Sequence, residues 1–438
     1  MVIKSDRTEV GILGAGIMGC CLALELAHRG YRVDLIELAS APMTAASLHN
    51  EGKLHLSFVY AKDPLKATHG LMVRGSLAFA RILEQLTGCG AEALIPSQPF
   101  HYFVPIDSQL DMAAIWHHFQ AVEAAIHAVS RNTGDLYLGR RLERFHERNS
   151  TSVHSRLFSP GLTLGSFKTE ELSVSPVAVA AILCAAIKKE SKITFIGNTE
   201  ILAVERLANG EVEIESRQGG KVSLNRVACV ANCLWEAKPR IDTSAGIPDH
   251  GPWIMRYKLT INISAPMATT GNIPSATGIL GAYGDLVNQG SGLYYVSWYP
   301  LCKIAQSING DERKLRDMIH TWVLPRAIKK VTSRTPAISK FIASITHRKF
   351  IDDNIAEMAA YIPSLGSLLN NKRTCELGGG VILARGATNI DDPESSLHQR
   401  SGIGPAAYGS YVTIDTGKYC MAPLFASEAA DMITNVLK

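Results

Sequence analysis

The sequence predicts an α/β protein with a Rossmann-like dinucleotide-binding domain. An apolar segment, residues 9–13, leads into a glycine-rich turn and then a helical segment. Strand and helix patterns alternate along the chain, and Rossmann-like segments recur near residues 170–240 and at the C-terminal end. We therefore expect a nucleotide domain built from discontinuous segments, with a domain of sheet and helices inserted between them. The expected ranges are residues 1–75, 165–240 and 371–438 for the first domain, and 76–164 and 241–370 for the second.

The first strand–turn–helix unit carries the pattern G-x-G-x-x-G. The first glycine permits a tight turn, the second lets the backbone approach a pyrophosphate, and the third allows the helix to pack closely on the strand. An acidic residue ends the second strand, where its carboxylate can accept hydrogen bonds from ribose hydroxyls. The expected dinucleotide contacts are Gly14, Gly16, Ile17, Met18, Gly19 and Glu37.

The remaining elements follow from apolar periodicity and turn residues. Helices are expected over residues 17–30, 64–88, 109–130, 176–189 and much of 310–370, with a final helix that ends near residue 437. Strands are expected over residues 31–37, 100–105, 193–207, 211–218, 220–225, 226–232, 254–264, 292–300, 378–386 and 411–415. This alternation supports the α/β class.

Composition excludes several classes of protein. The chain is 46% hydrophobic and 19% charged with a net charge of +4, which is ordinary for a globular protein, and no basic block predicts nucleic-acid binding. Nine cysteines without C-x-x-C spacing argue against a disulfide framework or zinc site and favour the cytoplasm. No signal peptide, membrane-spanning segment, metal-binding spacing or hydrolase elbow is evident. We expect no metal and no nucleic-acid partner, and the sequence leaves the oligomeric state open.

The glycine motif alone leaves open whether the cofactor is a nicotinamide or a flavin. The start "GILGAGIMG" also resembles NAD-dependent hydroxyacid and hydroxyacyl dehydrogenases, but those proteins continue with regular βαβ repeats, whereas this chain continues with "AASLHNEGKLH". With that segment, and with "VACVANCLWEA" and "DTGKYCMAP", the chain resembles the flavoprotein family of D-amino-acid oxidase, glycine oxidase and sarcosine oxidase. The resemblance implies FAD as the cofactor.

The resemblance also implies where the flavin lies. The segment after Glu37 would wrap the pyrophosphate and the ring, a later strand would touch adenine, and the last glycine turn would direct a helix N-terminus at the negative charge of the reduced ring. In relatives the strand 226–232 ends with a glycine, which this chain replaces by Asn232-Cys233. The implied FAD contacts are Ser47, Asn50, Gly52, Lys53, Ile201, Asn232, Gly417, Lys418, Tyr419, Cys420 and Met421.

Catalytic and substrate residues follow less directly. Lys303 occupies a place comparable to a flavin-adjacent lysine of sarcosine-oxidase-like relatives, where a cation would stabilise developing superoxide, although a surface lysine is the alternative. Lys53 and His55 are the other catalytic candidates because they lie in the flavin-wrapping segment. Aromatic side chains could form a box for an amine, and an arginine could clamp a carboxylate. The substrate candidates are Arg256, Tyr257, Tyr283, Tyr295, Trp298 and Arg400.

The expected reaction is therefore FAD-dependent oxidation of a C–N bond in a small amine or amino acid. Hydride would pass to flavin N5 to give an imine, and O2 or another acceptor would reoxidise the flavin. Three alternatives remain open. They are a FAD-dependent 2-hydroxy acid dehydrogenase, an NAD-dependent dehydrogenase, and an inactive flavoprotein that serves as a binding module.

Overall fold

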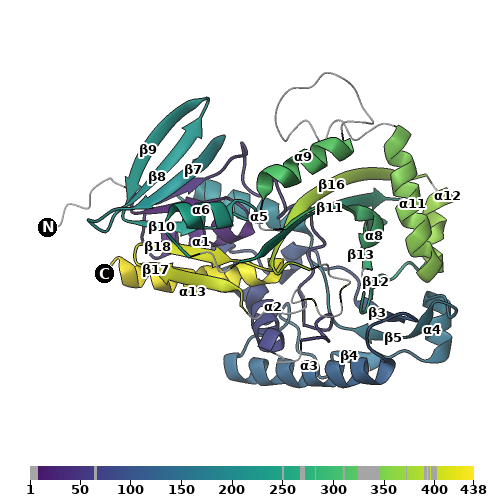
Figure 1. Ribbon diagram of the computed structural model, residues 1–438. Helices are drawn as coiled ribbons and strands as arrows, with labels where there is room; N and C mark the ends of the chain where they lie inside the picture. Colours follow the sequence, from purple (N-terminus) through teal and green to yellow (C-terminus); the bar gives the residue numbers. More distant parts are fainter. Residues whose placement is uncertain are drawn as a thin grey trace.

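A computed structural model describes residues 8–63, 67–248, 251–266, 272–281, 283–308, 311–323, 345–370, 372–388, 392, 395 and 402–438. The N-terminal and C-terminal parts of the chain lie side by side in one half of the molecule (Figure 1). A second half contains a large sheet with helices on its outer side (Figure 1).

A six-stranded sheet forms the centre of the first half. Its order is β17–β18–β10–β1–β2–β6, and it is parallel except for the antiparallel edge strand β17. The strands are β1 (Val10–Leu13), β2 (Val33–Ile36), β6 (Ile193–Ile196), β10 (Cys229–Asn232), β17 (Gly404–Tyr408) and β18 (Tyr411–Asp415). They come from the start, the middle and the end of the chain. This confirms the predicted α/β class with a discontinuous Rossmann-like sheet.

Helices and a small sheet cover the two faces of this parallel sheet. Helix α1 (Ile17–His28) is almost entirely buried, since α5 (Pro176–Lys189) and α13 (Ala422–Val436) pack on it. A three-stranded antiparallel sheet buries Ile214 and neighbouring apolar residues against Leu13 and Ile36. Its strands are β7 (Thr199–Arg206), β8 (Val212–Gln218) and β9 (Lys221–Val227). Burial on both faces explains why β1 is wholly apolar.

The second half is built on a nine-stranded sheet. The strand order is β15–β11–β14–β13–β12–β3–β5–β4, and β16 pairs with β11 along its whole length. The strands are β3 (Phe100–Pro105), β4 (His146–Arg148), β5 (Thr163–Thr169), β11 (Trp253–Ser264), β12 (Ser275–Gly278), β13 (Gly284–Gly290), β14 (Leu293–Trp298), β15 (Lys303–Ile308) and β16 (Thr374–Arg385). Strands β5 and β16 thus belong to this sheet. If the domains were divided according to their sheets, the predicted boundaries at residues 165 and 371 would move to about residues 170 and 386.

The two faces of this sheet differ in chemistry. Odd-numbered residues of β11, such as Met255 and Ile261, pack with α9 (Glu312–Val323) and α11 (Ile345–Tyr361) on the outer side. Even-numbered residues of the same strand, Arg256, Lys258 and Thr260, therefore lie on the opposite face, because strand residues alternate. We call this second surface the polar face.

The remaining helices of the described residues connect these elements. They are α2 (Ala67–Thr87), η1 (Ala91–Leu94), α3 (Met112–Thr133), α4 (Thr151–Leu157), α6 (Lys238–Ser244), α8 (Tyr299–Cys302), η3 (Pro363–Gly366), α12 (Ser367–Asn370) and η5 (Tyr419–Met421). Among the described residues, no helix combines the length and apolar character that crossing a bilayer requires.

Candidate active site

The turn between β1 and α1 is shaped by glycines. Gly14 adopts a φ of +92°, a conformation that favours glycine. A Cβ at Gly19 would lie 1.9 Å from the carbonyl oxygen of Gly14, so only glycine lets the helix pack this closely on the turn. Gly16 is the extended residue that precedes α1, and because it has no side chain it cannot cap the helix. Apart from the N–H of Ile17, the backbone N–H groups of the first turn are thus available to an anion.

Two side chains hold the turn from outside. The Ile17 backbone N–H donates to Ser47 Oγ at 3.0 Å, and the Ala15 N–H donates to Glu37 Oε2 at 2.7 Å. The other oxygen of Glu37 accepts from the Ala39 N–H at 3.0 Å. Each carboxylate oxygen of Glu37 thus keeps accepting capacity for a ribose hydroxyl. Met18, by contrast, is buried in the apolar core.

The segment from Ser47 to Lys53 is closely fitted to its surroundings. Asn50 Oδ1 accepts from the Gly52 N–H at 2.7 Å and its Nδ2 donates to the carbonyl oxygens of Ala46 and Ser47, so this side chain shapes the loop itself. A Cβ at Gly52 would lie 2.0 Å from the carbonyl oxygen of Val174.

The same segment crosses the glycine run of β16. A Cβ at Gly378 would lie 2.4 Å from His49 Nδ1, and one at Gly380 would lie 3.0 Å from Ala46. The segment therefore joins the N-terminus of α1 to the second sheet.

Lys53 lies in a buried charge cluster on the polar face. Its Nζ donates to Thr277 Oγ1 at 2.6 Å and to Asp285 Oδ1 at 2.7 Å, and it lies 3.9 Å from Glu171 Oε1. Burial alone would raise the pKa of Asp285, but the ammonium groups of Lys53 and Lys258 hold it well below its usual range. Burial raises the pKa of Glu171, which also accepts from the Tyr102 hydroxyl.

Several other polar groups on this face have atoms without partners among the described residues. Arg256 is 1% exposed, and its Nη1 donates to the Tyr299 hydroxyl at 2.7 Å while its Nε has no partner. Thr260 Oγ1 and the Tyr295 hydroxyl are likewise buried and unpaired. Such groups are costly to bury, so they indicate space for a polar ligand.

Lys258 adds a further positive charge to the polar face. Burial works against its ammonium, but the Tyr295 hydroxyl and the carboxylates of Glu51 and Asp285 outweigh burial and raise the pKa of this lysine. Lys258 therefore carries its charge at neutral pH.

The predicted aromatic substrate residues do not come together. Tyr295 lies on the polar face, whereas Tyr257 packs beside Trp253 and Met255 on the outer side. Tyr283 and Trp298 belong to the outer aromatic cluster with Tyr361, and Trp298 donates to Glu357 at 2.7 Å. Alternation along the strands thus separates them. Arg400 lies outside the described residues.

Lys303 and His55, two of the predicted catalytic residues, and Lys418, a predicted FAD contact, lie in three different settings. Lys303 begins β15 directly opposite Lys258 of β11, with its Nζ 5.4 Å from the centre of the Tyr299 ring. Lys418 Nζ lies 5.8 Å from the centre of the Tyr60 ring. His55 is buried, and its Nε2 lies 4.0 Å from Glu51 Oε1.

The last glycine turn leads into α13 as expected. Gly417 has a φ of +58° and is followed by η5. The side chain of Met421 packs against Gly75 of α2, and the Tyr419 ring lies 6.0 Å from Phe79. Cys420 is also buried, and burial raises the pKa of its thiol. These three side chains anchor the helix start in the core.

Two predicted contacts serve the packing of the first half. Ile201 is buried in the core between the three-stranded and six-stranded sheets. Asn232 donates to Asp242 at 2.8 Å and to the Tyr411 hydroxyl at 2.9 Å, and its Oδ1 accepts from the Leu234 N–H. The side chain of Asn232 is therefore fully used within the protein.

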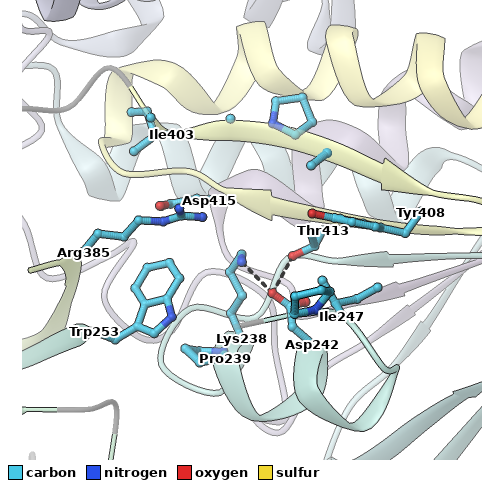
Figure 2. Close-up of a pocket in the computed structure, with 15 residues that line it drawn as sticks. Lys238, Pro239, Asp242, Ile247, Trp253, Arg385, Ile403, Tyr408, Thr413 and Asp415 are labelled. Carbon is cyan, nitrogen blue, oxygen red and sulfur yellow. Dashed lines mark hydrogen bonds and ion pairs between the residues drawn. The ribbon is translucent and has the colours of Figure 1, made fainter. Parts of the chain in front are cut away.

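A pocket of about 140 Å³ lies beside this network, between α6, the β17–β18 hairpin and the adjoining ends of β11 and β16. Figure 2 shows Lys238 and Thr413 directed at the Asp242 carboxylate, with distances of 2.6 and 2.9 Å. Arg385, whose guanidinium lies 5.1 Å from the Trp253 ring centre, forms the opposite wall. This pocket is separate from the charge cluster around Lys53.

Sequence reasoning missed three residues of the polar face, Lys258, Thr277 and Asp285. Their only signal was alternation with apolar neighbours, as in "GDLVN" and "RYKLT". Which face pointed inward depended on strand pairing, and the sequence did not indicate that.

The glycine turn, the acid at the end of β2 and the polar face together define a dinucleotide-dependent oxidoreductase. The family model for FAD dependent oxidoreductase (DAO) matches residues 9–247, more than half of the chain. The chain belongs to this family of FAD-dependent oxidoreductases. This confirms the resemblance read from "AASLHNEGKLH", and with it FAD as the cofactor.

Two curated relatives illustrate its sequence similarity. The bifunctional tRNA 5-methylaminomethyl-2-thiouridine biosynthesis protein MnmC of Burkholderia pseudomallei is 24% identical over 254 residues, which cover 54% of this chain and 32% of that protein. The mitochondrial L-2-hydroxyglutarate dehydrogenase of Arabidopsis thaliana is 34% identical over 65 residues, 15% of this chain and 14% of that protein. The matched region spans about a third or less of either relative.

Solved structures share the fold over nearly the whole chain. Glycine oxidase from Geobacillus kaustophilus superposes with a TM-score of 0.65 at 12% identity, covering 98% of this chain and 95% of that one. L-Amino acid deaminase from Proteus myxofaciens, in complex with anthranilate, gives a TM-score of 0.63 at 16% identity, covering 99% and 91%.

The residues present fit FAD. The close approach at Gly19, the uncapped start of α1 and the carboxylate of Glu37 match the needs of the pyrophosphate and the ribose. The loop of Ser47 to Lys53 then leads from the phosphate site to the polar face, where the chemistry would occur. When bound, the flavin supplies the acceptor of two electrons.

Proposed function

We propose that the protein oxidises the C–N bond of a small amine or amino acid, with FAD as the electron acceptor. One observation carries the proposal. Arg256 is a buried guanidinium without an acidic partner among the described residues, and its Nε has no hydrogen bond. A buried cation of this kind costs several kcal/mol unless an anion joins it. The carboxylate of an amino acid is such an anion.

The role of the protein in this reaction is to position the substrate. Arg256 and Tyr299 would hold the carboxylate, and the loop of Lys53 would exclude water from the polar face. Such a site needs no strong base, because oxidation requires a neutral amine held in the correct orientation. The names of structural neighbours, glycine oxidase and L-amino acid deaminase, support this class of substrate.

The visible spectrum of the purified protein tests the proposal. We expect bound flavin, and we expect a small amino acid added without oxygen to bleach it. Arg256→Gln should weaken substrate binding by about ten-fold, which is equivalent to about 1.4 kcal/mol of binding free energy. Bleaching by 2-hydroxy acids alone would contradict the proposal.

Oxidation of a 2-hydroxy acid is the second candidate. It is favoured by the local similarity to L-2-hydroxyglutarate dehydrogenase. An unpaired arginine would serve the carboxylate of either substrate, so the spectral titration separates the two candidates.

Reoxidation by O2 is a further part of the proposal. Lys303 and Lys258 are paired residues on neighbouring strands. Because both side chains are cationic, they would stabilise the negative charge of superoxide as it forms. Lys303→Met should slow reoxidation of the reduced flavin by O2 while leaving anaerobic reduction unchanged. Equal reoxidation rates in the variant and the parent would exclude this role.

A further inference from the structure

We propose that Asp285 is the residue that recognises the amino group of the substrate. This inference rests on the proposed function, since it presupposes that the substrate is an amine or amino acid. It concerns a different residue from Arg256 and a different end of the substrate.

Among the described residues, only one of the two carboxylate oxygens of Asp285 accepts hydrogen bonds. Oδ1 accepts from Thr277 Oγ1 at 2.6 Å and from Lys53 Nζ at 2.7 Å. No described residue donates to Oδ2, and 19% of the side-chain surface remains accessible, whereas Lys53 beside it is 1% accessible. A carboxylate held in this way is fixed in position and has one oxygen left to accept a hydrogen bond from a ligand.

Strand pairing places Asp285 on the same surface as the other unpaired groups. Asp285 and Val287 point to one side of β13, Val287 pairs with Tyr295, and Tyr295 pairs with Asn262 on β11. By alternation, Asn262 shares its face with Lys258 and Arg256. The polar face thus presents one free carboxylate oxygen together with two cations, a pattern complementary to a molecule that carries both an amino group and a carboxylate.

The charge state of Asp285 suits this role. Because Lys53 and Lys258 keep the pKa of its carboxyl low, Asp285 is ionised at neutral pH. A substrate ammonium gains attraction to this charge, and a neutral amine can donate one N–H while its lone pair stays unshared. The hydroxyl of a 2-hydroxy acid can donate as well, but it brings no positive charge and therefore gains less.

Asp285→Asn tests the assignment, because it keeps the shape and removes the charge. Asp353→Asn is the matched control, since Asp353 forms an exposed ion pair with Lys349 on α11. Binding of glycine, L-proline and iminodiacetate is measured against glycolate and 2-hydroxyglutarate, without oxygen. The two readouts are the perturbation of flavin absorbance and the shift of the thermal unfolding midpoint.

We expect Asp285→Asn to weaken binding of the amine probes at least about ten-fold and binding of the hydroxy acids about two-fold or less. Asp353→Asn should bind both classes of probe as the parent protein does. If the single variant fails to fold, Lys53→Gln/Asp285→Asn removes both buried charges and is measured instead. Equal weakening of both probe classes, or unchanged binding of the amines, would overturn the assignment.

The two proposals fail in different ways. If amines reduce the flavin of the parent protein but bind Asp285→Asn unchanged, the role of Asp285 is wrong and the proposed function stands. If only hydroxy acids bind and reduce the parent flavin, the proposed function is wrong, and the role of Asp285 is overturned with it.

Discussion

Lys53 Nζ lies 2.7 Å from Asp285 Oδ1, although 232 residues separate the two along the chain. The contact joins the loop that follows the dinucleotide turn to the sheet of the second half. It therefore connects the part of the protein proposed to bind the cofactor to the surface proposed to bind the substrate.

Removing one member of this pair should destabilise the protein. Lys53→Met would remove the ammonium that donates to the Asp285 carboxylate and leave only Lys258 as a nearby cation, and we expect a loss of about 3 kcal/mol in the free energy of unfolding, measured with urea. The double variant Lys53→Met/Asp285→Leu should recover part of this loss, because the Asp285 charge is removed with its bonded partner while Glu171 and Lys258 remain. A loss below about 1 kcal/mol in the single variant would show that the pair contributes little to stability.

Gly19→Ala should abolish flavin binding. The added Cβ would lie 1.9 Å from the Gly14 carbonyl oxygen, so the turn would have to move away from its present position. The ratio of flavin to protein absorbance in the purified variant measures the effect. Gly70→Ala in α2 is the control, since nothing lies within 4 Å of a Cβ there, and it should retain full flavin. Normal flavin content in Gly19→Ala would contradict the assigned phosphate site.

The Asp242 network should be essential for folding of the first half. The carboxylate accepts from Lys238, Asn232, Tyr411 and Thr413 at 2.6 to 2.9 Å. Asp242→Ala leaves the buried Lys238 ammonium unpaired, and we expect a loss of about 3–5 kcal/mol. Tyr411→Phe removes one hydrogen bond and should cost about 1 kcal/mol. Urea unfolding of both variants tests whether Asp242→Ala loses more free energy of unfolding than Tyr411→Phe. A larger loss in Tyr411→Phe would refute the prediction.

Stability should fall in acid partly through His101. Burial, and to a lesser degree the nearby Lys168, lower the pKa of His101 from 6.5 to about 4. The unfolded chain therefore binds a proton below pH 6.5 that the folded protein binds only near pH 4. The contribution of His101 to stability is complete above pH 6.5 and is lost as the pH falls toward 4.

Replacement of this histidine measures that contribution. His101→Asn should flatten the decline in unfolding free energy between pH 6.5 and 4 relative to the parent. His117→Asn, a change at an exposed histidine of α3, is the control. An identical pH profile for His101→Asn and the parent would contradict the prediction.

Local sequence determined much of the first half. Residues 9–37 combine a short apolar run, glycines at fixed spacing and a helix-forming segment, and these features specify strand, turn and helix without distant contacts. For this reason the predicted helix start at residue 17 matches α1, and the predicted strand 31–37 contains β2. Side-chain contacts of Asn232, Tyr419 and Met421 were less predictable, since packing partners far along the chain use them.

The chemistry of the site depended on the tertiary structure. The sequence identified Lys53 but not its partner Asp285, and it grouped Tyr257, Tyr283, Tyr295 and Trp298 as one box. A strand places neighbouring residues on opposite faces, and only the pairing of β11 with β14 and β16 fixes which face is covered by α9 and α11. The sequence by itself thus determined the dinucleotide turn and the family. Strand register, set by contacts across hundreds of residues, decided which charges share the polar face.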